Sequence, residues 1–132
     1  MHQSSNQKEN NPMKKLLIIL LLISPFSFAD WGDVYYCHMT TFSSTTLEGK
    51  RTDAYLQKFQ FKLDKTKKAM VFGKGGYLGD REMEIRKGTI DSEEEWYAAD
   101  RYSTANFVEG KFVYAFIGMF GGNFMTADCD KF

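Results

Sequence analysis

Hydrophobic and polar side chains alternate along most of the chain, and a period of two is typical of half-buried β-strands. The clearest run is residues 55–64, in which Phe59, Phe61 and Leu63 alternate with charged or amide side chains. Because successive side chains of a strand point to opposite faces, this run predicts an antiparallel strand with one face on a core and one in water. Tyr55 has the spacing of the core-facing residues and is expected on the same face.

The same alternation predicts several more strands, separated by short polar or glycine-containing links. They are residues 34–42, 69–72, 82–87, 96–102, 104–108, 111–119 and 124–130. Residues 111–117 are apolar on both faces, which favours a central, well-covered strand. Residues 48–49 and 109–110 are both Glu-Gly and predict two tight turns between strands.

Links this short allow neighbouring antiparallel strands, whereas parallel strands need crossovers of a dozen or more residues. We therefore expect an all-β fold, a small antiparallel meander of seven to eight strands that closes into a barrel. A β-sandwich with both terminal strands adjacent in one sheet is the alternative.

The first part of the chain indicates where the protein is located. Residues 13–29 contain two lysines, a short apolar stretch, and then Ser27 and Ala29 at the expected cleavage site. This order is typical of a secretory signal peptide, and the apolar stretch is shorter than the roughly 20 residues of a membrane-spanning helix. We predict that residues 1–29 are an N-terminal extension and cleaved signal peptide, and that residues 30–132 are a single β-domain, secreted or periplasmic.

The chain contains only two cysteines, Cys37 and Cys129, which fall on the first and last predicted strands. Export would place them in an oxidising compartment, so we predict a disulfide between them. A disulfide requires Cα atoms about 4.4–6.8 Å apart. The first and last strands must then lie close together, as they do in a closed barrel.

Charge and histidine content argue against several classes of site. The 17 basic residues balance the 17 acidic ones, so nothing indicates binding to nucleic acid or to anionic lipid. His38 is the only histidine after the expected cut, and with both cysteines paired no common zinc site can be assembled. The glycine-rich residues 73–79 lack the spacing of a phosphate-binding loop. We assign no catalytic, metal or cofactor-binding residue and do not expect an enzyme.

Aromatic residues are abundant, with 12 Phe, 7 Tyr and 2 Trp. Core packing of strands accounts for most of them, while a ligand cavity or an exposed recognition face would use the others. Tyr77 lies among the glycines of residues 73–79, which predict an exposed, mobile loop with the tyrosine at or near its tip. We take Tyr77, Trp96 and Tyr97 as candidate binding residues.

The sequence Tyr35-Tyr36-Cys37 near the expected mature start, the short strands and the late cysteine together resemble small periplasmic inhibitors of lysozyme. No segment matches the Ser-Gly-Ala-type loop of those inhibitors, so the resemblance transfers no residue role. We expect a monomeric, non-enzymatic binding or inhibitor-like module that contacts another exported protein through loops such as residues 73–80 or 91–95. The alternative is a small barrel carrier that holds an apolar or aromatic ligand in an internal cavity.

Overall fold

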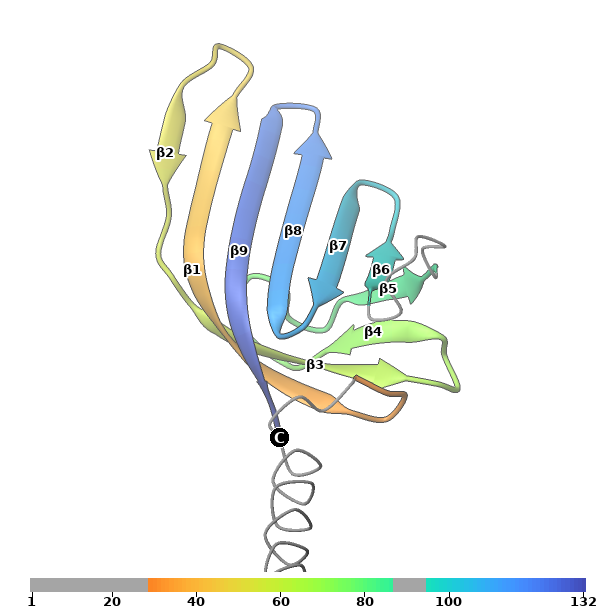
Figure 1. Ribbon diagram of the computed structural model, residues 1–132. Helices are drawn as coiled ribbons and strands as arrows, with labels where there is room; N and C mark the ends of the chain where they lie inside the picture. The colour runs from red at the N-terminus through yellow and green to blue at the C-terminus, as the bar shows by residue number, and fades with distance from the viewer. Residues whose placement is uncertain (1–28, 87–94) are drawn as a thin grey trace, which may run out of the picture.

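The computed structural model describes residues 29–86 and 95–132, and these contain nine strands and no helix. The strands are β1 (Val34–Thr46), β2 (Arg51–Asp53), β3 (Lys58–Asp64), β4 (Ala69–Phe72), β5 (Glu82–Ile85), β6 (Trp96–Ala99), β7 (Ser103–Val108), β8 (Lys111–Gly118) and β9 (Gly121–Lys131). All neighbours are antiparallel, and pairing of β1 with β9 closes eight of the strands into a barrel (Figure 1). The predicted barrel is therefore confirmed, and the sandwich is wrong.

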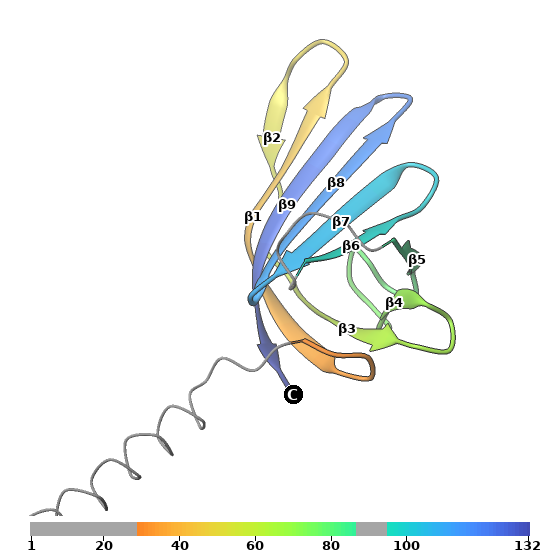
Figure 2. The same cartoon turned by 45° about the vertical axis from the view of Figure 1, so that its right-hand side comes forward.

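The long strand β1 has two different neighbours along one of its edges. Its residues 34–38 pair with β3, and its residues 43–45 pair with the extra strand β2. On the other edge β1 follows β9 for most of its length, with a β-bulge between Met39 and Thr41. As a result, the β1–β2 and β8–β9 hairpins extend beyond the barrel (Figures 1 and 2).

Aromatic rings fill the centre of the barrel. Phe61 on β3 contacts Phe107 on β7, with ring centroids 5.2 Å apart, and Phe72 on β4 contacts Phe112 on β8 at 6.0 Å. In the eight-stranded ring, β3 stands opposite β7 and β4 stands opposite β8. Side chains from opposite walls therefore meet in the middle, as in other eight-stranded barrels with packed interiors.

Two short segments cover the ends of the barrel. Before β1, Trp31 packs edge-on against Trp96 at a centroid distance of 5.0 Å. At the opposite end, the loop between β4 and β5 buries Leu78 and places the ring of Tyr77 against Phe42 at 4.7 Å. These contacts extend the hydrophobic core to both openings.

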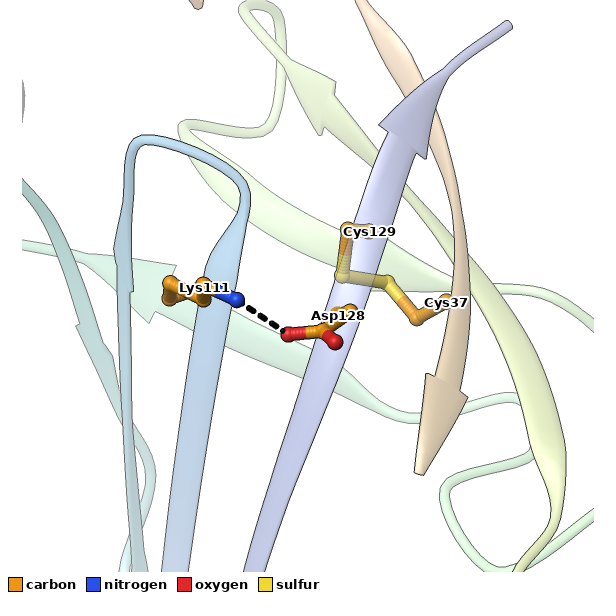
Figure 3. The surroundings of a disulfide bond; sticks show 4 residues. All are labelled: Cys37, Lys111, Asp128 and Cys129. Carbon is orange, nitrogen blue, oxygen red and sulfur yellow. Dashed lines mark hydrogen bonds and ion pairs between the residues drawn. A yellow bond between two sulfur atoms is a disulfide. The ribbon is translucent and has the colours of Figure 1, made fainter. Parts of the chain in front are cut away.

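The predicted disulfide is present and joins Cys37 on β1 to Cys129 on β9, where the two residues are directly paired (Figure 3). Both cysteines are buried on the interior face. On the outer face beside them, Lys111 and Asp128 form a 2.7 Å ion pair between β8 and β9. Because these two side chains are largely exposed, the pair adds little stability, and the disulfide is the stronger link. Its presence is compatible with an oxidising, exported location.

Two strand predictions were wrong. Tyr55 is 88% exposed and precedes β3, although the chain before β3 still bonds to β1 through the Met39 N–H and the Gln57 carbonyl. Strand β8 is not covered on both faces, since Ile117 is 76% exposed. The outer face of β8 has no second layer over it in the described part of the chain, so the apolar run did not indicate burial.

Candidate functional site

Tyr77 is partly buried and packs against the core rather than lying at an exposed loop tip. Its hydroxyl accepts a 2.6 Å hydrogen bond from Nδ2 of Asn123, and its backbone N–H donates to Oε1 of Gln57 at 3.0 Å. Its ring also contacts Tyr114, with centroids 5.7 Å apart. Residues 74–76 of the β4–β5 loop are exposed as predicted, but the predicted exposed position of Tyr77 is wrong, because this residue is partly buried and packs against the core. A role of Tyr77 in binding stays an untested prediction.

The other two candidate binding residues, Trp96 and Tyr97, do not lie close to Tyr77. Trp96 is buried in the interior, at the barrel end opposite Tyr77, while Tyr97 is partly buried on the outside of β6. Of the acidic segment 91–95, residues 91–94 lie outside the described residues. Glu95 accepts a 2.8 Å hydrogen bond from Nδ2 of Asn106. The three aromatic residues do not form a common site.

A buried polar network lies beneath the β4–β5 loop. Nη1 of Arg81 donates to Oγ of Ser103 at 3.0 Å and to the hydroxyl of Tyr114. Burial raises the pKa of the Tyr114 hydroxyl above its ordinary value. Ser103 and Tyr114 are both buried, and Asp100 lies 3.9 Å from Arg81. The network connects the start of β5 to β7 and β8, which is a structural role.

The described residues contain neither a metal site nor a membrane-spanning helix. They contain no group of three histidine, cysteine, aspartate or glutamate residues that could hold a metal ion. No helix within them is long and apolar enough to cross a membrane.

The turns of the two extending hairpins expose large apolar side chains. Met119 and Phe120 form the turn between β8 and β9, and each is 79% exposed. Leu47, in the turn between β1 and β2, is 70% exposed. Because Thr46 pairs with Gly121 in the β1–β9 ladder, the two turns lie side by side (Figure 2).

On β8 and β9, the outer face below these turns carries no charged side chain between residues 115 and 124. Ile117 on β8 points outward, and on β9 Phe124, which is 49% exposed, lies between Ala115 of β8 and Ser43 of β1. The outward positions of β3 are different, since residues 58–64 place lysine, glutamine and aspartate there. We call the exposed set at the end of the two hairpins the apolar tip. It consists of Leu47, Ile117, Met119, Phe120 and Phe124.

The interpretation of the sequence missed the apolar tip, although one local signal was available. Met119 and Phe120 stand between Gly118 and Gly121 and form a two-residue turn. Exposed turns normally contain small polar residues or glycine, which prefer water to apolar contact. Two large apolar residues at that position have no local structural reason, which favours a role in contact.

Comparison of the chain with protein-family models, with curated proteins and with solved structures found no match. The function is therefore argued from the geometry of this chain alone.

Proposed function

We propose that this protein is an exported, non-enzymatic module that binds another protein through the apolar tip. The observation that carries the proposal is a packed barrel with two hairpins that extend beyond it and expose large apolar side chains. Exposed apolar patches on small proteins commonly mark interaction sites. The β8–β9 ladder continues to the pair Gly118 and Gly121, so Met119 and Phe120 are held in place before binding, which lowers the entropic cost of association.

The packed interior favours this module over the carrier. A ligand cavity typically has a volume of about 300 Å³ or more. In this barrel, the contacts of Phe61 with Phe107 and of Phe72 with Phe112 occupy the centre. A ligand would have to separate rings that come from opposite walls, at the cost of the core that stabilises the fold.

The shape and charge of the hairpins indicate what kind of surface they fit. Two neighbouring turns that extend from the body of a protein fit a concave surface, as an inhibitor-like module requires. Residues 115–124 carry no charge, and residues 43–53 carry two acidic and two basic side chains, of which Arg51 and Asp53 are 3.3 Å apart. With no net charge on the hairpins, we expect apolar contact to dominate and the affinity to depend weakly on salt.

Export is part of the same proposal. The predicted signal peptide falls largely outside the described residues, and its last residue, Ala29, packs against the core together with Trp31. The buried disulfide is compatible with an oxidising compartment. Secreted material is expected to have the intact mass of a chain that begins at Asp30. A mass that includes the apolar segment of residues 16–23 would contradict the predicted export.

The binding proposal is tested by the double variant Met119→Ser/Phe120→Ser, made in cells that produce the protein naturally. A matched control, Lys65→Ser/Thr66→Ser, changes the exposed β3–β4 turn. Because all four side chains are exposed, both variants should melt within about 2 °C of the wild type, as surface changes usually do. Native mass spectrometry should find a protein partner with the wild type and the control.

The tip variant should retain that partner at least about tenfold less, because apolar anchors at the centre of an interface often contribute more than about 1 kcal/mol each. Equal recovery with the tip variant would overturn the proposal. A small apolar molecule that accompanies the wild type in place of a protein would favour the carrier.

A further inference from the structure

Strand β2 is the outermost strand of the sheet on its side, within the residues that the structure describes. It pairs with β1 alone, with Thr52 opposite Ser44. On either side of it, the N–H of Thr46 bonds to the carbonyl of Lys50 at 2.9 Å, and the N–H of Ala54 bonds to the carbonyl of Phe42 at 2.8 Å. These two bonds establish which residues of β2 form hydrogen bonds with β1.

In an antiparallel ladder, residues that bond to the neighbouring strand alternate with residues that do not. Lys50 and Ala54 bond to β1, so Thr52 between them does the same. Arg51 and Asp53 then direct their backbone N–H and C=O groups away from β1, toward the free edge. This edge offers two donors and two acceptors to another strand.

We propose that β2 pairs edge to edge with β2 of a second copy of this chain, around a two-fold axis at Thr52. In this antiparallel register, Arg51 of one copy lies opposite Asp53 of the other, and the reverse. The residues whose backbone groups face the free edge are then the ones that form hydrogen-bonded pairs. The free backbone donors and acceptors of one copy therefore face those of the other.

The side chains are complementary in the same register. Arg51 and Asp53 face one side of the sheet and already lie 3.3 Å apart within one chain. Around the axis, each basic side chain meets an acidic one, and opposite charges directly across a ladder are favourable. A strand with two like charges at these positions would repel its own copy.

The segment that follows β2 leaves further apolar surface in solvent beside this edge. Tyr55 is 88% exposed and Leu56 is 57% exposed, directly after the strand. In the proposed register, Tyr55 lies opposite Gly49 of the second copy, where no side chain obstructs it. Burial of these residues in the dimer adds an apolar contribution to the free energy of association that hydrogen bonds alone would not supply.

The resulting dimer is small and reversible. A three-residue edge with its flanks buries less than the roughly 1,200–2,000 Å² of a stable complex, so the dimer should form only at high concentration. This proposal replaces the expected monomer and does not depend on the proposed function. If both hold, a dimer presents two apolar tips, which would raise its avidity for a partner with two sites.

Charged, short edge strands also serve to prevent pairing, and the experiment separates the two roles. Sedimentation of the wild type up to about 1 mM should show a monomer–dimer equilibrium. Asp53→Arg makes both charges on β2 basic, and Arg51→Asp makes both acidic. Each variant alone should associate at least about tenfold more weakly, because two attractive pairs become repulsive. A mixture of the two variants should recover association as a heterodimer, which native mass spectrometry resolves.

A cross-link tests the register itself. At the two-fold axis Thr52 faces its own copy as a non-hydrogen-bonded pair, with Cα atoms about 4.5 Å apart, which suits a disulfide. Thr52→Cys should therefore oxidise to a covalent dimer much faster than Thr66→Cys, placed in the exposed β3–β4 turn. A wild type that stays monomeric, charge variants that associate like the wild type, or equal cross-linking of the two cysteine variants would each overturn the proposal.

Discussion

Removal of the Phe61 side chain tests the packed interior most sharply. Phe61 is 1% exposed, and its ring lies 5.2–5.7 Å from the rings of Tyr35, Phe72, Phe107 and Phe112. Truncation of a buried phenylalanine to alanine costs about 3–5 kcal/mol, and the cost is highest where the surroundings cannot collapse. The rings around Phe61 are fixed to strands on opposite walls, so we expect a value in the upper part of that range.

For a domain of roughly 100 residues, this loss corresponds to a fall in Tm on the order of 15–30 °C. Thermal and denaturant unfolding of Phe61→Ala measure it. The control is Lys62→Ala, on the outer face of the same strand, which should change the free energy of unfolding by less than about 0.5 kcal/mol.

The same variant separates the binding module from the carrier. An engineered apolar cavity stays dry and can bind small apolar atoms, so xenon NMR should detect binding to Phe61→Ala and not to the wild type. Equal destabilisation by Phe61→Ala and Lys62→Ala would show that the strand register is wrong. Xenon binding to the wild type would show a cavity where the account places packed rings.

Three further predictions concern other parts of the fold. The disulfide closes a loop with a sequence separation of 92 residues, so Cys37→Ser/Cys129→Ser should lose about 4–5 kcal/mol in the chain-entropy model, measured by denaturant unfolding. Burial raises the folded-state pKa of Tyr114, so the unfolded state loses its proton first and the free energy of unfolding should fall as the pH rises above about 10. The denaturant midpoint at high pH should fall less in Tyr114→Phe than in the wild type. An equal fall in the two proteins would contradict the assignment. Tyr77→Phe removes the acceptor for Asn123 and should cost about 1 kcal/mol with unchanged partner binding, whereas weakened binding without a loss of stability would restore Tyr77 as a contact residue.

Local pattern predicted most of the barrel. Alternation in residues 58–64 and the polar turn that follows place β3 and β4, and the cysteines on the first and last strands required the closure that the structure shows. These features depend on neighbouring residues or on one covalent link, so a single sequence contains the information.

The candidate site depends on contacts that no local pattern encodes. Alternation shows which side chains share a face, but it does not show whether a second layer covers that face, so the exposure of Ile117 was missed. In the same way, the partly buried position of Tyr77 depends on distant residues such as Asn123, 46 residues later in the chain, which donates to its hydroxyl. A tyrosine among glycines looks the same in the sequence whether its loop folds inward or extends into solvent.

The most direct test of the proposed function is site-specific photo-cross-linking in the cells that make the protein. A photoreactive residue is placed at Phe120, in the apolar tip, and in a separate protein at Thr66, in the β3–β4 turn at the other end of the barrel strands. We expect the probe at Phe120 to join the chain to one other protein and the probe at Thr66 not to do so. Cross-links of equal yield at both positions, or none at Phe120, would contradict it.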